Sequence, residues 1–173
     1  MADRRVSSGL SDEEIEDIIR DNYREVFKYC FLKTKDYSCA EDITQDTFLR
    51  FIEYLPKYSD KGKPKALLYT IARNLCINWH EKKKPDQLLD DVIDRIRSLN
   101  EDEDIVTRLS LERYLEELPK EHQEILMLRY YQELSINELT QVFEVNRFAI
   151  MYRLKVAKKM LKTIMEQGGW HYE

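Results

Sequence analysis

Two segments of the chain bring basic and aromatic side chains together, which is the combination that nucleic-acid binding requires. From Lys61 to Lys84 there are seven basic residues and one acidic residue, and from Val145 to Met165 there are six basic residues and no acidic one. Cations bind the phosphate backbone, and aromatic rings stack on unpaired bases. The two segments therefore predict two points of contact with a polyanion, although the net charge of the whole chain is −5.

The segment from Val145 to Met165 has the pattern of an amphipathic helix whose outer face fits a DNA major groove. Spacings of four, three and four residues predict an inward face of Ile150, Leu154, Ala157 and Leu161. In a groove-bound helix the N-terminal residues reach base edges and later basic residues reach phosphates. The base candidates are Asn146, Arg147, Phe148 and Met151 with Tyr152 beside them, and the phosphate candidates are Arg153, Lys155, Lys158 and Lys159. The alternative is a solvated amphipathic helix, which the absence of acidic residues in this segment disfavours.

The basic segment from Lys61 to Lys84 predicts a helix with basic and aromatic side chains along one face. Spacings of four, four, three, four and four residues connect Lys65, Tyr69, Arg73, Cys76, His80 and Lys84, with Asn74 and Trp79 at the flanks. A ring among cations suits an unstacked base, because the ring stacks on the base while the cations hold the backbone. The alternative is that Tyr69 and Trp79 are core aromatics and that the lysines form an ordinary solvated face.

Helices must position these residues, and the composition favours an all-α fold. Glycine and proline are scarce, with four of each, whereas β-sandwiches and barrels need many turns. Capping boxes with the pattern S-x-x-E mark helix starts at Ser11, Ser38 and Ser135. The apolar periodicity places helices at 12–34, 38–55, 64–84, 106–118, 119–133, 135–143 and 147–166. Inward faces are expected at Ile43, Thr47, Phe48, Phe51, Ile52 and Leu55 in the second helix, and at Leu68, Ile71, Leu75 and Asn78 in the third.

These helices group into two lobes. Residues 12–84 form a three-helix domain, which we call the first lobe, and residues 105–166 form a four-helix domain, the second lobe. Residues 85–104 form an acidic linker, while 1–11 and 167–173 are terminal segments. Two helices around the turn Glu144-Val145-Asn146, the second of them basic, predict a helix-turn-helix in the second lobe.

Other chemistry finds little support in the sequence. The three cysteines, Cys30, Cys39 and Cys76, form no C-x-x-C pair, so we expect small buried or half-buried thiols in a reducing compartment. The three histidines lack the spacing of a metal site or of a nucleophile–base pair, and no phosphate loop or hydrolase motif occurs. We therefore expect no enzyme, metal or cofactor. The polar N-terminus and the lack of a long apolar run predict a cytoplasmic protein without membrane insertion.

Three ordered motifs resemble a known family. The segment Ala40–Phe48 (AEDITQDTF) resembles the polymerase-binding helix of bacterial sigma factors of the extracytoplasmic function (ECF) type. The segment Leu68–Trp79 (LYTIARNLCINW) resembles their helix that reads the promoter's −10 element. Leu118-Pro119, Ile125-Leu126, Leu134-Ser135 and Glu138-Leu139 resemble the start of their −35-reading domain. The resemblance covers roughly residues 12–84 and 105–162.

The resemblance implies a sigma factor that binds core RNA polymerase, reads both promoter elements and assists strand opening. It implies contacts to the clamp helices of the β′ subunit by Asp42, Gln45, Asp46, Leu49 and Arg50. It implies capture of a flipped-out −10 base by the third helix and the loop before it, through Lys63, Lys65, Tyr69, Arg73, Asn74, Asn78, Trp79 and Lys83. The second lobe would sit on the β flap and read the −35 element with Asn146, Arg147, Phe148, Met151, Tyr152, Arg153, Lys155 and Lys158.

The resemblance extends to regulation and to the linker. An anti-sigma factor covering both lobes is an expected partner, and the free chain is expected to be a monomer. By analogy the acidic linker would thread toward the RNA exit path, where its eight acidic residues could mimic nucleic acid.

Several positions depart from the family's pattern. Leu67 stands where a tryptophan is usual, Asn78 replaces an aspartate, and Trp79 replaces a tyrosine. In the last helix Phe148 replaces a small residue and Met151 replaces a lysine or arginine. Two apolar side chains on the base-reading face favour contacts with thymine methyl groups over guanine.

The main rival function is a stand-alone helix-turn-helix regulator. It predicts dimers on palindromic sites, whereas a sigma factor is a monomer that needs core polymerase. This rival explains the second lobe but gives no function to the polar face of the second helix.

Overall fold

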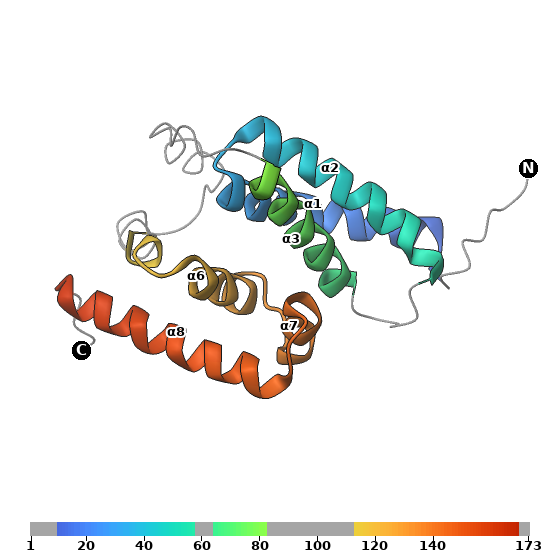
Figure 1. Ribbon diagram of the computed structural model, residues 1–173. Helices are drawn as coiled ribbons and strands as arrows, with labels where there is room; N and C mark the ends of the chain where they lie inside the picture. The colour runs from blue at the N-terminus through green and yellow to red at the C-terminus, as the bar shows by residue number, and fades with distance from the viewer. Residues whose placement is uncertain (1–9, 58–63, 83–112, 170–173) are drawn as a thin grey trace, which may run out of the picture. The chain divides into compact units, whose positions relative to one another are not determined.

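The computed structural model describes residues 10–57, 64–82 and 113–169 (Figure 1). The chain divides into two compact units, Met1–Ser98 and Leu99–Glu173, which contain the first and the second lobe. All regular structure within the described ranges is helical, so the all-α prediction is confirmed. The predicted linker at 85–104, together with Lys63 and Lys83, lies outside the described residues.

The first lobe consists of three helices that pack against one another in pairs (Figure 1). They are α1 (Asp12–Thr34), α2 (Tyr37–Tyr54) and α3 (Pro64–Lys82), with the 3₁₀ turn η1 (Leu55–Lys57) after α2. The capping box predicted at Ser11 is confirmed, because Ser11 and Glu14 each accept a hydrogen bond from the other's backbone N–H. The bond from the Ser11 backbone N–H is the main reason why the pKa of Glu14 lies below its usual value.

The start of α2 corrects one prediction. The helix begins at Tyr37, and its N-cap is Asp36, whose carboxylate accepts a hydrogen bond from the Cys39 backbone N–H at 3.0 Å. The capping box predicted at Ser38 is therefore wrong. The sequence offered two acceptors two residues apart, and the tight turn after α1, where Lys35 has φ 54°, favours the earlier one.

Aromatic rings and small polar groups share the core of the first lobe. Tyr29 of α1 packs edge-on against Tyr69 of α3 with ring centroids 5.4 Å apart. The buried hydroxyl of Thr44 donates to the Ala40 carbonyl, and that of Thr47 donates to the Ile43 carbonyl, so neither hydroxyl is a buried polar group without a partner. The core also holds two cysteines.

These two thiols come from different helices. Cys30 of α1 and Cys76 of α3 are both completely buried, and Cys39 is half-buried, as predicted. A hydrogen bond with the Cys76 side chain lowers the pKa of the Cys30 thiol below its ordinary value, although burial opposes this shift.

The second lobe is built on the long helix α8 (Arg147–Gln167). A helical turn at 113–116 precedes α6 (Lys120–Leu126), the π-helical turn η2 (Met127–Tyr131) and α7 (Ile136–Phe143). In Figure 1, α7 lies beside the N-terminal end of α8 and α6 packs along its middle. The single helix predicted over 119–133 is thus an α-helix that widens into a π turn.

The helix-turn-helix of the second lobe is confirmed in detail. Ser135 and Glu138 form the predicted capping box at the start of α7. Glu144 ends α7 in a left-handed conformation with φ 53°, which turns the chain sharply. Asn146 then caps α8, since its side-chain oxygen accepts a hydrogen bond from the Ala149 backbone N–H at 2.9 Å.

Candidate nucleic-acid interface

The outer face of α8 displays large apolar side chains to solvent. Phe148 is 82% exposed, Tyr152 69% and Met151 50%. The inward face is as predicted at Ile150, Leu154 and Ala157, which are buried and hold the helix against α6 and α7. Contiguous exposed apolar side chains are typical of interaction sites, so this face of α8 is a candidate binding face.

Two of the base-reading candidates already have partners within the protein. The Asn146 side-chain oxygen accepts the capping hydrogen bond of α8, and its amide N–H groups remain able to donate to a base. The Arg147 guanidinium donates to the Asn137 side-chain oxygen of α7 at 3.2 Å. The hydrogen-bonding groups at this end are therefore held in place, and Phe148 and Met151 provide the protruding surface.

Of the phosphate candidates on α8, Lys155, Lys158 and Lys159 are exposed, whereas Arg153 is half-buried. Arg153 follows Phe148 by five residues, which places it about 140° around the helix axis. Arg153 therefore lies at the flank of α8, toward its packed side, and its contact with a phosphate stays a prediction.

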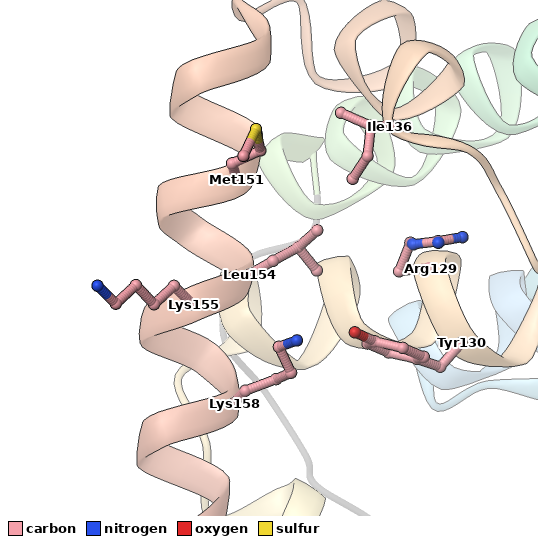
Figure 2. A pocket seen from close by; sticks show the side chains of 7 residues that line it. All are labelled: Arg129, Tyr130, Ile136, Met151, Leu154, Lys155 and Lys158. Carbon is pink, nitrogen blue, oxygen red and sulfur yellow. The ribbon is translucent and has the colours of Figure 1, made fainter.

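The structure adds three residues that the sequence had not indicated. A hollow in the second lobe is lined by Arg129 and Tyr130 of η2, Ile136 of α7, and Met151, Leu154, Lys155 and Lys158 of α8 (Figure 2). Arg129 and Tyr130 were hidden in a segment expected to be a regular helix. The available signal was the run Arg129-Tyr130-Tyr131, a cation followed by two aromatics.

The outer face of α2 carries the five residues expected to bind polymerase. Leu49 is 62% exposed, Asp42, Gln45 and Arg50 are exposed, and Asp46 is half-buried. The Arg50 Nε donates to both carboxylate oxygens of Asp46 at 3.1 Å. This ion pair fixes two side chains beside the exposed Leu49.

Ile52 corrects another expectation on α2. It was predicted to face inward, yet it is 38% exposed and lies one turn after Leu49. Phe48 and Phe51 fill the corresponding part of the core instead, and both are buried. Ile52 therefore widens the apolar part of the outer face.

The inward face of α3 differs from the prediction. The buried residues are Ala66, Leu68, Tyr69, Ala72 and Cys76, while Ile71 and Leu75 are half-buried and Asn78 is exposed. The expectation that Tyr69 stacks on an unpaired base is wrong, because its side chain is completely buried. The alternative, a core tyrosine, is correct for Tyr69. Small Ala66 and Ala72 let α3 approach its neighbours closely, so this side of the helix faces the core.

The remaining −10 candidates separate into two groups. Asn74 and Asn78 are exposed and lie one turn apart, whereas Lys65, Arg73 and Trp79 are half-buried. The neighbouring His80 forms a hydrogen bond through Nε2 with the Lys33 carbonyl of α1 at 2.7 Å. The exposed asparagines are therefore the members of the set best placed to meet a base edge.

Comparison with known proteins assigns the family. A family model described as sigma-70 region 2 matches residues 18–85, and one described as sigma-70 region 4 matches residues 114–163. The RNA polymerase sigma factor YlaC of Bacillus subtilis is 30% identical over 169 residues, which cover 90% of this chain and 96% of that relative. The ECF RNA polymerase sigma factor SigM of the same organism is 29% identical over 160 residues, covering 89% and 96%. The chain belongs to the ECF sigma factors. It directs RNA polymerase to promoters.

Solved structures confirm the fold of this sigma factor. CnrH in complex with the cytosolic domain of CnrY aligns over 95% of both chains with a TM-score of 0.66 and 16% identity. The sigma factor RpoE in complex with the anti-sigma factor NepR from Bartonella quintana aligns over 89% of this chain and 98% of that chain, with a TM-score of 0.65 and 16% identity.

The described residues of the sigma factor contain neither a candidate metal site nor a candidate membrane-spanning helix. Within the described ranges no three His, Cys, Asp or Glu side chains are grouped as a metal site requires. No described helix has both the length and the hydrophobicity needed to cross a membrane.

Substitutions of Tyr69 and Asn78 in the sigma factor distinguish a buried core residue from an exposed candidate for reading the −10 element. Tyr69→Ala removes a buried ring and is expected to destabilise the first lobe by about 3–5 kcal/mol, measured by chemical unfolding. Asn78→Ala removes an exposed side chain and is expected to leave stability unchanged while altering the −10 preference in transcription assays. A Tyr69→Ala variant with normal stability would contradict the core assignment.

Proposed function

We propose that the sigma factor reads the −35 element as duplex DNA with the outer face of α8 and the −10 element as an unpaired strand with α3. The observation that carries this proposal is the outer face of α8. Its N-terminal half exposes Phe148, Met151 and Tyr152, its later turns expose lysines, and Ile150 and Leu154 fix it to the lobe. This arrangement fits a helix that enters the major groove with its N-terminal residues.

The chemistry of this face suggests which base pairs it accepts. Phe148 and Met151 have no hydrogen-bonding group that suits guanine, but both can contact a thymine methyl group in the major groove. Arg147, held by Asn137, lies at the same end of α8 and can donate to an acceptor on a neighbouring base. A −35 element with A·T pairs opposite Phe148 and Met151 is therefore expected.

The first lobe supplies the polymerase and −10 contacts in this proposal. The outer face of α2, with Leu49 beside the Asp46–Arg50 ion pair, docks on the β′ clamp helices, and the second lobe sits on the β flap. Asn74 and Asn78 of α3 contact a flipped-out base of the −10 strand, and Trp79 lies next to them. The protein carries no catalytic site of its own and acts in the cytoplasm by positioning the polymerase.

An anti-sigma factor is the proposed regulator. The exposed apolar side chains of α2 and α8 are needed only when polymerase and promoter are present, so a partner that covers them would keep the free sigma factor inactive. The complex of RpoE with the anti-sigma factor NepR, whose sigma factor has a similar fold, supports this part of the proposal.

In vitro transcription with core polymerase tests the function. The sigma factor is expected to give promoter-specific transcripts from genomic fragments, and core polymerase without it is expected to give none. A gel shift on a selected fragment, with and without core polymerase, separates the rival regulator. Tight, specific binding by the free chain as a dimer would overturn the proposal.

A further inference from the structure

The π turn η2 has no role in the base contacts or the polymerase contacts described above. It interrupts the helix that begins as α6 and is closed by a hydrogen bond from the Gln132 backbone N–H to the Met127 carbonyl at 3.0 Å. Such turns insert one extra residue and are often found at functional sites. Here the turn carries Arg129 and Tyr130 toward α8, where both line the hollow shown in Figure 2.

Two cations lie near the Tyr130 ring. The Arg129 guanidinium carbon and the Lys158 ammonium nitrogen are each 5.8 Å from the centre of the Tyr130 ring. Figure 2 shows Lys158 extending from α8 toward the ring, whereas Lys155 points away from it. Arg129 is fixed further by donating to the Leu134 carbonyl at 2.9 Å.

The charge and exposure of the hollow suit an anion. Three of its seven lining residues are basic, and none of these seven is acidic. Tyr130 is 55% exposed and Lys158 is exposed, while Arg129 is half-buried, so the Lys158 ammonium group can reach a ligand. Lysine has a flexible four-carbon chain, so a ring that holds its ammonium group reduces the entropy lost when that group binds a phosphate.

We propose that Tyr130 is a positioning residue, whose ring holds Lys158 and Arg129 ready to bind a phosphate of the DNA backbone beside the −35 element. This inference rests on the proposed function, because it requires α8 to lie in the major groove at that element. The same α8 face that exposes Met151 also contributes Lys158, so a strand bordering the groove passes the hollow. The contact adds affinity without sequence preference.

The test uses the full-length sigma factor bound to core polymerase. The dissociation constant for a promoter fragment is measured over a range of salt concentrations, for an intact and for a scrambled −35 element. Tyr130→Leu removes the ring, Tyr130→Phe keeps it, and Tyr131→Leu is the matched control, since Tyr131 is 54% exposed and is not among the residues that line this hollow. Thermal unfolding checks that all variants fold.

Tyr130→Leu is expected to weaken binding about threefold on both fragments, the loss expected of an exposed cation–π contact. It should also reduce the steepness of log affinity against log salt by about one, the change expected for one lost phosphate contact. Tyr130→Phe and Tyr131→Leu should bind like the wild type. In the background of Lys158→Ala with Arg129→Ala, Tyr130→Leu should have no further effect, because its role depends on those two cations.

The inference would be overturned if Tyr130→Leu and Tyr131→Leu weakened DNA binding equally. It would also be overturned if Tyr130→Leu still weakened binding about threefold in the background without the two cations. If the wild-type holoenzyme itself fails to bind or transcribe any promoter, the proposed function is wrong. These failures are distinguishable, because the first concerns only differences between variants of a working holoenzyme.

Discussion

Leu49→Asp is expected to weaken the binding of core RNA polymerase by about thirtyfold or more, which corresponds to the roughly 2 kcal/mol loss of an interface hot spot. Leu49 is 62% exposed and stands beside the Asp46–Arg50 ion pair on the outer face of α2. An interface that buries this position would have to desolvate the new carboxylate, and the leucine's apolar contact would be lost. Fluorescence anisotropy of the labelled sigma factor with core polymerase measures the effect.

Tyr54→Asp is the matched control for Leu49→Asp. Tyr54 is 56% exposed on the same helix but lies about 140° around its axis from Leu49. The Tyr54→Asp variant should bind polymerase like the wild type. Both variants should unfold at the same denaturant concentration as the wild type, because both sites are on the surface. Equal loss of polymerase binding in the two variants would show that α2 docks by a different face.

The double variant Phe148→Ala with Met151→Ala is expected to lose about tenfold in discrimination between a matched and a mismatched −35 element. This loss corresponds to one base contact of roughly 1–3 kcal/mol. Affinity for scrambled DNA should change little, because the lysines of α8 remain. Transcription from a promoter library randomised at the −35 element, with the wild-type and the variant holoenzyme, measures the preference.

Deoxyuridine gives the matched control on the DNA side. Replacing −35 thymines by deoxyuridine removes only the methyl groups, so it should reduce wild-type binding and leave the double variant unaffected. If Arg147→Ala and Met151→Ala both keep the −35 preference of the wild type, the base-reading residues have been assigned wrongly.

The sequence alone predicted the features that depend on neighbouring residues or on a helix with a single apolar face. The limits of α1, the capping boxes at Ser11 and Ser135, and the turn before α8 all depend on hydrogen bonds between residues a few positions apart. The outer face of α8 was equally readable, because apolar residues fill one stripe while Phe148 and the lysines occupy the opposite side. On α2 the family resemblance indicated the five outer-face residues, and periodicity alone misplaced Ile52.

Only the tertiary structure decided which side of α3 is buried. This helix has apolar residues on nearly every side, so its periodicity supports more than one inward face, and the prediction chose Ile71 and Leu75 over Tyr69 and Cys76. The choice depends on Tyr29 and Cys30 of α1, which are far away in the sequence. Tyr29 packs edge-on against Tyr69, and Cys30 forms a hydrogen bond with the Cys76 side chain. The hollow at Tyr130 is a second case. A π turn and two cations from separate helices meet there, and such a meeting depends on how helices pack and not on the spacing of residues within one of them.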